Sequence, residues 1–461
     1  MDITSDGITC SGLDETKTFQ NIIERKSDSI ILIPRKCRVV LDSIRLPLNI
    51  QIVGEGSSSV LQHKSGASGH MLFQSHKGST TVLANLTLDG NYMGNGGDDH
   101  QEYVTFLLGA GGASTDNPTE VWIENVAFVN GGYADVSTHY SDTPFPAHWV
   151  MRHVRHLGGA IGFTPPYHDY WAGTFSGAIT GEFTDIVIDP QRLPTTATQA
   201  GRAGYGFFLY APNDQNRHAL NLNSVVCTRT GHSTESITGG CVAVHEGVRN
   251  MLLDNLVSRQ AIGVGVNFKA NIENLTIQHV VIDGVTASDM PNAIVNGCIA
   301  MDPATADLPQ AGHDIFISSV HCSGSQGNGI HLAFGNGAHP TALATHVTLS
   351  DFIIADCRRV GLSLRDPSDL TVRDGTISRC GTALNAYSSS DLPLSPINII
   401  DTHVRDSGPC LLDTQVRRAF LAGRALPIDH ELTSQPENQY GPPNLSINSE
   451  DNCLIFSENN K

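Results

Sequence analysis

Residues able to carry out acid–base chemistry recur in a series of similar short segments between Gly206 and Tyr387. Most of these segments begin with Gly and alternate small or apolar residues with variable ones. When the segments are aligned on that Gly, polar residues fall at the fourth to sixth positions after it. We therefore predict that the following residues lie together at one edge of one sheet: His245, Glu246, Lys269, Asp302, Arg365 and Asp366.

One reaction open to such residues is the removal of a proton alpha to a carboxylate, as in a uronate lyase. It needs a base that takes the proton and a cation that stabilises the enolate-like charge. His245 or Lys269 can serve as the base, and Arg365 or Arg217 can supply the cation. His245 is the favoured single candidate, because it interrupts an apolar strand and is followed by an acid.

A hydrolase instead needs two carboxylates, ~5–5.5 Å apart for retention or ~6.5–9.5 Å apart for inversion. Glu246 and Asp302 are two coils apart in the alignment, or ~10 Å along the stack, which fits inversion better. Both assignments stay open, because acids and bases at strand ends are also common as solvated corner residues. His331, second after its own Gly, is expected to face the opposite side from its immediate neighbours.

Candidate substrate-binding residues flank this series. Tyr210 ends one segment, and Arg217 and His218 close the loop that follows it; Asp366 lies beside Arg365. A further insertion at 163–175 is rich in His and aromatic residues, and loops on a rigid scaffold often carry function. We consider it a sugar-stacking platform or, alternatively, a loop packed on the wall by its own aromatics; the residues concerned are His168, Tyr170 and Trp171.

A repeat of strands must position these residues. A second series of strand-like segments begins at intervals of about 23 to 40 residues, a period typical of solenoids. Within each segment apolar residues alternate with polar ones, as Leu275, Ile277 and Val280 illustrate. No helical period of useful length separates the strands. The pattern therefore predicts an all-β fold in which parallel strands stack as a β-helix.

The cysteines recur with the repeat. Four follow or end strands of the second series, and two come directly after the Gly of the first; these are Cys227, Cys322, Cys357, Cys380, Cys241 and Cys298. Because free Cys behaves as a small hydrophobic residue, we predict buried thiols at equivalent positions in preference to disulfides. There is no CxxC pair of the metal-binding type. We expect neither a metal nor a cofactor.

Charge and hydropathy exclude several classes of partner. The chain has 461 residues and a formal net charge of −18, which argues against nucleic acid and anionic membranes. No run of apolar residues is long enough to span a membrane. The N-terminus lacks the basic and apolar regions of a secretory signal. The protein is therefore predicted to be cytoplasmic as synthesised, or released without a signal as a virion component.

The N-terminal block carries the most specific likeness to a known family. GITCSGLDETKTFQNII is followed by IILIP, VVLDSIRLP and IQIVGEG, and this order resembles the N-terminal cap of the pectate-lyase superfamily. The chain departs from that pattern at Arg35 and Lys36, where a Gly usually follows the Pro. The resemblance implies a right-handed parallel β-helix with a helical cap. We expect the cap and first coils over 1–75, the β-helix over 76–408 and a C-terminal cap or tail over 409–461.

The same resemblance implies a carbohydrate-active enzyme that cleaves or remodels a polysaccharide along the solenoid. Hydrolase, lyase and epimerase stay open, and the negative charge favours hydrolysis of a glycan of low charge. One alternative is a tailspike-like protein that binds a glycan receptor, which would be a homotrimer. Another is a β-helix enzyme that acts on a small molecule, since a fold alone does not fix function.

Overall fold

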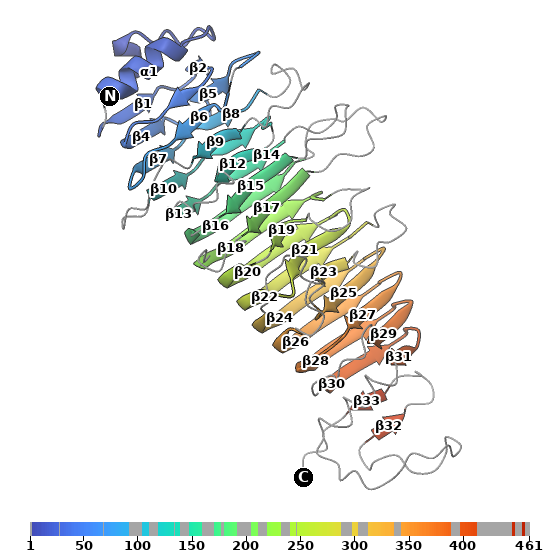
Figure 1. Ribbon diagram of the computed structural model, residues 1–461. Coiled ribbons are helices and arrows are strands. Elements are labelled where there is room, and N and C mark those ends of the chain that lie inside the picture. The colour runs from blue at the N-terminus through green and yellow to red at the C-terminus, as the bar shows by residue number, and fades with distance from the viewer. Residues whose placement is uncertain are drawn as a thin grey trace.

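In the computed structural model the chain forms a solenoid of parallel strands stacked along one axis (Figure 1). An 18-stranded sheet, here sheet A, and a 13-stranded sheet, here sheet B, alternate along the chain. The structure describes residues 2–26, 28–67, 69–91, 104–109, 119–132, 134–138, 147–158, 170–176, 179–190, 204–210, 219–231, 240–245, 247–286, 297–302, 312–335, 343–388, 397–412, 445–447 and 454–456.

The strands of sheet A are β1 (Ile30–Ile33), β2 (Arg38–Leu41), β4 (Asn49–Gly54), β5 (Val60–His63), β7 (Thr80–Ala84), β8 (Thr87–Asp89), β10 (Thr119–Glu124), β11 (Ala127–Val129), β13 (Ala147–Arg152), β14 (Arg155–Leu157), β16 (Ile179–Asp189), β18 (Ala219–Thr228), β20 (Arg249–Arg259), β22 (Glu273–Asp283), β24 (His313–Ser323), β26 (Thr345–Ala355), β28 (Leu370–Ser378) and β30 (Ile397–Arg405).

The strands of sheet B are β3 (Ile44–Arg45), β6 (Leu72–Gln74), β9 (Val104–Leu108), β12 (Ala134–Thr138), β15 (Tyr170–Ser176), β17 (Gly204–Tyr210), β19 (Val242–Val244), β21 (Val264–Lys269), β23 (Gly297–Asp302), β25 (Asn328–Ala333), β27 (Val360–Arg365), β29 (Thr382–Tyr387) and β31 (Cys410–Leu412). Outside the two sheets lie η1 (Ile3–Asp6), α1 (Thr16–Arg25) and the antiparallel pair β32 (Leu445–Ile447) and β33 (Leu454–Phe456).

The register stacks like residues above one another. Leu275 of β22 pairs with Met251 of β20 on one side and Ile315 of β24 on the other. Side chains at alternate positions therefore form apolar columns inside the solenoid. This arrangement confirms the predicted parallel β-helix.

Sheet A bends sharply once in each coil, at a residue with left-handed backbone conformation. In β20 this residue is Asn255, with φ of 51°, and the partners on either side of it pair normally. A side chain that is short and polar tolerates this conformation best. The equivalent residues in the long strands, with φ between 44° and 59°, are Asp185, Ser224, Asn255, His279, Ser319, Asp351, Asp374 and Asp401.

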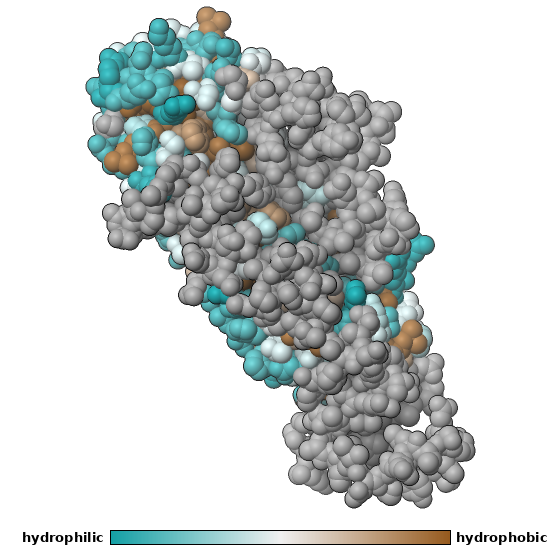
Figure 2. All heavy atoms as spheres, in the orientation of Figure 1, coloured by the Kyte–Doolittle hydropathy of each residue, from teal (hydrophilic) through white to brown (hydrophobic). Residues whose placement is uncertain are grey.

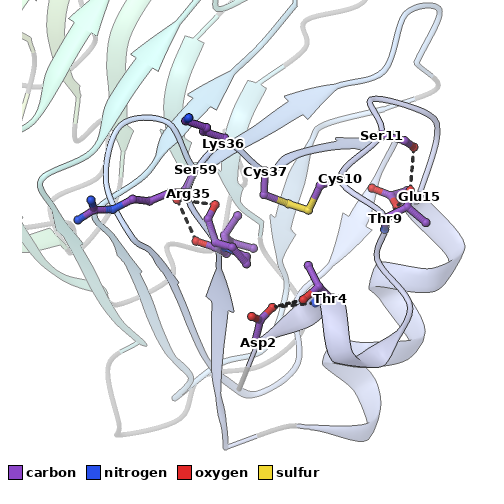
Figure 3. Close-up of a disulfide and its surroundings, with 12 residues drawn as sticks. Asp2, Thr4, Thr9, Cys10, Ser11, Glu15, Arg35, Lys36, Cys37 and Ser59 are labelled. Atoms are coloured by element: carbon purple, nitrogen blue, oxygen red, sulfur yellow. Dashed lines mark hydrogen bonds between the residues drawn. A yellow bond between two sulfur atoms is a disulfide. The ribbon is translucent and has the colours of Figure 1, made fainter.

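The N-terminal end is closed by the predicted helix. α1 buries Phe19, Ile22 and Ile23 against the first coils. A disulfide between Cys10 and Cys37 ties the segment before the helix to the turn after β1 (Figure 3). The surface at this end of the molecule is mainly hydrophilic (Figure 2), as the outer face of a terminal cap needs to be.

The prediction of unpaired thiols is wrong for most of the described cysteines. Besides Cys10–Cys37, disulfides join Cys227 to Cys241 and Cys298 to Cys322, and Cys410 is also disulfide-bonded. Each of the two inner bridges joins a Cys near the end of a sheet A strand to a Cys at the start of a neighbouring sheet B segment. A cysteine that recurs at the same position of the repeat stacks above its equivalents in the same sheet. The disulfide partners instead meet at a corner between the two sheets, which the recurrence does not reveal. The remaining two, Cys357 and Cys380, are buried and free, as predicted.

The predicted division at residues 75 and 408 stays a prediction. Sheet B itself continues to Leu412, and β33 lies against β30 of the final coils. Within the described ranges, no helix has the length and apolar character to cross a membrane.

Candidate functional site

The outward face of sheet B carries a buried polar cluster between β19 and β27. In β21, Val266 and Phe268 point into the apolar core. Asn267 and Lys269 alternate with them and so face outward. Both are nevertheless almost wholly buried, with 0% and 4% of their surface exposed. A buried amide and a buried ammonium outside the core must be held by specific polar contacts.

One outward column contains most of the predicted catalytic residues. Lys269 pairs with Asp302, and Ala333 pairs with Arg365. The adjoining pairs complete the column. Leu209 pairs with Val244 and Val244 with Phe268, which adds Tyr210 and His245. Met301 pairs with Leu332, which places Asp302 beside Ala333. In chain order the column is Tyr210, His245, Lys269, Asp302, Ala333 and Arg365.

Lys269, Asp302 and Asn267 contact one another across two coils. Asn267 Nδ2 donates to Asp302 Oδ2 at 2.7 Å, and Lys269 Nζ lies 3.8 Å from the same oxygen. Asp302 is 2% exposed, and a buried carboxylate needs polar partners of this kind. Asn267 Oδ1 is buried and accepts no hydrogen bond. It presents an acceptor that a hydroxyl of a ligand could satisfy.

A second outward column, two residues before the first along each strand, contains His331. Asn267 pairs with Ala300, Ala300 with His331, and His331 with Ser363. His331 is 2% exposed, and its Nδ1 lies 3.0 Å from Ser363 Oγ. Burial, together with the nearby positive charge of Arg365, lowers the pKa of His331 to about 4. The imidazole is therefore neutral at neutral pH.

Arg365 lies at the end of β27 beside a buried carboxylate. Its Nε is 3.6 Å from Asp366 Oδ2, and Ser388 Oγ donates to Asp366 Oδ1 at 3.2 Å. The Arg365 side chain keeps 42% of its surface exposed, whereas that of Asp366 keeps 5%. The Nε atom of the guanidinium thus lies beside the Asp366 carboxylate, while part of the side chain is exposed to solvent.

His245 borders the cluster on its N-terminal side. Its ring is buried and packs edge-on against Phe208, with centroids 4.7 Å apart. Phe208 in turn stacks on Tyr210 at 6.0 Å. An aromatic pair therefore lies directly beside the acid–base cluster, an arrangement suited to the apolar face of a sugar ring.

The structure brings together the predicted residues that it describes, although the alignment on Gly was wrong in detail. His245, Lys269, Asp302 and Arg365 share one column rather than three adjacent positions. Tyr210 belongs to the same column, and Asp366 follows it. Glu246, Arg217, His218 and His168 lie outside the described residues, and of Tyr170 and Trp171 only the backbone, at the start of β15 and not in a loop, is described.

Three polar residues of the cluster were given no role by sequence reasoning: Asn267, His331 and Ser363. The predicted orientation of His331 is confirmed, since Ile330 and Leu332 enter the core. However, the number of residues between the Gly that starts each segment and the residue in the outward column varies from strand to strand. His331 is second after Gly329, whereas Asn267 is fourth after Gly263, so counting from Gly separated residues that the register aligns. Alternation with core residues is the signal that would have found them.

The cluster combines one neutral base with two cations. His331 can accept a proton, and Lys269 and Arg365 can stabilise negative charge. The described carboxylates, Asp302 and Asp366, are both engaged by polar partners. No group of His, Cys, Asp and Glu suited to a metal ion occurs among the residues that the structure describes.

Comparison with known proteins agrees with the fold. Residues 260–414 match the family of right-handed β-helix regions. No curated protein matches the chain in sequence. The fold that the resemblance of the N-terminal block implies, a right-handed parallel β-helix, is confirmed.

Several solved structures resemble the chain. The Streptococcus pneumoniae surface protein and adhesin PfbA has a TM-score of 0.50 at 11% identity, covering 89% of this chain and 99% of that one. The A-module of an Azotobacter vinelandii mannuronan C-5 epimerase has a TM-score of 0.43 at 13% identity, covering 89% of this chain and 97% of that one. A Yersinia enterocolitica family 28 exopolygalacturonase has a TM-score of 0.42 at 10% identity, covering 88% of this chain and 77% of that one. At these identities the likeness concerns the fold.

Proposed function

We propose that the protein is a carbohydrate-active enzyme that removes the proton alpha to the carboxylate of a uronate residue in a polysaccharide. The observation that carries this proposal is the neutral, buried imidazole of His331 in the column next to Arg365. A base that stays unprotonated beside a fixed cation suits proton abstraction, because the cation stabilises the charge that develops. The superfamily resemblance of the N-terminal block supports a polysaccharide as substrate.

The roles follow from the geometry. With Nδ1 protonated and donating to Ser363 Oγ, His331 Nε2 carries the lone pair that accepts the substrate proton. Arg365, which reaches solvent, binds the carboxylate and stabilises the enolate-like intermediate. Lys269, held by Asp302, adds a second positive charge. Departure of the glycosidic oxygen would complete a lyase reaction, and return of a proton to the opposite face would complete an epimerisation.

This proposal revises the preference for hydrolysis. That preference depended on Glu246, which lies outside the described residues, and on the negative charge of the whole chain. The local charge is different, since Lys269 and Arg365 in the cluster balance the carboxylates of Asp302 and Asp366. A uronate is thus compatible with the site although the protein is acidic overall.

The test is digestion of a panel of polysaccharides, neutral and uronate-containing, with three readings. Ultraviolet absorbance of unsaturated uronates reports elimination, reducing ends report any cleavage, and deuterium uptake from heavy water reports epimerisation. We expect His331→Gln to lower the rate about 10²–10⁴-fold, the usual worth of a general base. His153→Gln, which changes an exposed His between β13 and β14 and outside the cluster, is the matched control and should retain activity.

The outcomes separate the alternatives. Reducing ends without absorbance would establish a hydrolase and overturn proton abstraction. Activity that survives in His331→Gln but not in His245→Ala would transfer the role of base to His245. No product from any polysaccharide, with wild type and variants folded by circular dichroism, would reject the enzyme proposal.

A second candidate function is glycan binding without cleavage, as in a receptor-binding protein. It is favoured by a groove of about 640 Å³ on the outer side of the sheet A bend, lined by the valines of β18, β20 and β22 and by His279, His321 and Ile353. Glycan retained without turnover would support this function. Such a protein is expected to be a homotrimer, which sedimentation would reveal, whereas a monomer would argue against it.

A further inference from the structure

Two free thiols occupy equivalent positions in adjacent coils. Cys357 comes two residues after β26, and Cys380 comes two residues after β28. The register continues through this corner, since Ala355 pairs with Ser378 and Gly381 N donates to Cys357 O at 3.0 Å. Equivalent positions in adjacent coils are ~4.8 Å apart. That separation of Cα atoms lies within the range that a disulfide spans.

The surroundings direct both sulfur atoms to the same side. A Cβ atom placed on Gly329 would lie 3.1 Å from Cys357 Sγ, and one placed on Gly361 would lie 3.2 Å from Cys380 Sγ. Gly329 and Gly361 are themselves neighbours in sheet B, because the residues that follow them pair. Each thiol therefore lies over the glycine that starts the preceding sheet B segment, and the two sulfurs are related by one coil.

The two thiols also contact each other. A hydrogen bond between the two thiols lowers the pKa of Cys380 and raises the pKa of Cys357. A backbone hydrogen bond from Cys357 lowers the pKa of Cys380 further, while burial opposes it and the charges of Asp356 and Arg379 act in opposite directions. The pair thus contains one sulfur with enhanced thiolate character and one that keeps its proton, which is the division of roles that thiol–disulfide exchange requires.

We propose that Cys357 and Cys380 form a redox-active dithiol that closes to a disulfide between adjacent coils, with a low-molecular-weight disulfide as oxidant. The Cys380 thiolate attacks one sulfur of the oxidant, forming a mixed disulfide and releasing a thiolate. The Cys357 thiol then loses its proton and attacks Cys380 Sγ, which releases the second thiolate. Two electrons pass to the oxidant, and both protons end on its two thiols.

The position of the pair makes this modification site relevant to the cluster on sheet B. Gly329 and Gly361 lie in the strands that carry His331 and Ser363, so closure would fix the starts of these strands relative to each other. The oxidant reaches the sulfurs by local opening of the last coils, since Cys357 and Cys380 are 2% and 4% exposed. The inference does not depend on the proposed activity, because it concerns thiol chemistry alone.

The experiment equilibrates the full-length protein in glutathione buffers from fully reduced to fully oxidised. After acid quenching and alkylation, peptide mass spectrometry counts free thiols and identifies linked peptides. We expect Cys357 and Cys380 to lose their thiols together and to appear as one linked peptide. The same digest also identifies the other disulfides. It therefore shows in which buffers those bonds remain intact while Cys357 and Cys380 change state.

Two single variants test the assignment of roles. In Cys357→Ser we expect Cys380 to accumulate as a mixed disulfide with glutathione, because the resolving thiol is absent. In Cys380→Ser we expect Cys357 to react at least tenfold more slowly. Serine is a suitable replacement, because Ser325 and Ser407 occupy the same position in the flanking coils and Ser407 Oγ accepts from Cys380 N at 3.0 Å.

The proposal is overturned if both thiols stay free in the most oxidising buffer while Cys227–Cys241 and Cys298–Cys322 are intact. It is also overturned if either cysteine pairs with a different partner. If a variant fails to fold, the paired loss of thiols in the wild-type protein still decides the matter.

Discussion

The imidazole of His331 differs from the surface histidines of sheet A in what surrounds it. His279 and His153 are more than half exposed, and each lies near an aspartate, at 2.7 and 3.3 Å. His331 is enclosed and faces a guanidinium. Burial and a nearby positive charge both oppose protonation. The same residue type is thus an exposed partner of an aspartate in one sheet and a buried, neutral imidazole in the other.

This difference predicts a pH dependence of stability. His331 and His63 both have pKa values lowered to about 4 by burial, against 6.5 for an exposed His. Between these pH values the unfolded chain binds protons that the folded chain does not. The free energy of unfolding should therefore decrease as pH falls from 6.5 to 4, by about 3 kcal/mol for each His.

Urea unfolding at a series of pH values measures this effect. His331→Gln and His63→Gln should each flatten the dependence between pH 6.5 and 4, whatever their effect on absolute stability. His279→Gln, which removes an exposed His, should leave the slope unchanged. An unaltered slope in both buried-site variants would show that these residues are protonated in the folded protein.

At the scale of elements, the bend of sheet A depends on residues that tolerate a left-handed backbone. We predict that Asn255→Val lowers the free energy of unfolding by about 1–2 kcal/mol, because a β-branched residue is strained at positive φ. Asn255→Gly should be much milder, since Gly adopts this conformation freely. Chemical unfolding of both variants measures the difference.

The matched control for that prediction is Asn223→Val. Asn255 Nδ2 donates to Asn223 Oδ1 at 3.0 Å, so this variant loses the same hydrogen bond while Asn223 lies outside the left-handed region. If Asn223→Val is as destabilising as Asn255→Val, the hydrogen bond rather than the backbone strain explains the cost.

The β-helix could be predicted because its strands alternate visibly, as Leu275, Ile277 and Val280 do. Alternation depends only on which residues enter the core, and the core is the dominant source of stability. The site was predicted less fully. Counting from Gly assumes that every sheet B strand starts at the same distance from that residue. β21 starts after Gly263 and β25 before Gly329, so Asn267 and His331 could not be aligned without the register.

The cysteine pairs show a second limit. Cys227 and Cys322 are equivalent in the repeat, and stacked thiols are what equivalence alone predicts. The actual partner of Cys227 is Cys241, which directly precedes the next strand of sheet B. The actual partner of Cys322 is Cys298, at the start of the preceding strand of sheet B. Whether such residues meet depends on how tightly a corner turns, and that depends on backbone conformations that the sequence pattern does not display.

At the scale of the whole molecule, the Cys10–Cys37 disulfide joins the N-terminal segment to the first coil. It closes a loop with a sequence separation of 27 residues, for which the chain-entropy estimate is about 3–4 kcal/mol. We predict that replacing both cysteines by Ala lowers the melting temperature and exposes the cap to proteolysis first. Limited proteolysis beside calorimetry tests this; cleavage that begins instead at the C-terminal end would contradict it.

The disulfides also bear on localisation, which stays a prediction. Such bonds persist in oxidising compartments and on particle surfaces and are rare in the cytosol. Of the two localisations predicted from the sequence, we therefore favour association with a particle over residence in the cytoplasm.

The helix α1 has a consequence that concerns other molecules of the same chain. A stack of parallel strands ends in unpaired N–H and C=O groups, and a second stack could continue the hydrogen bonding from there. α1, with Phe19, Ile22 and Ile23 turned toward the first coils and a hydrophilic outer face, occupies this position. We therefore expect the helix to keep the first coil of one chain from serving as a template for the strands of another.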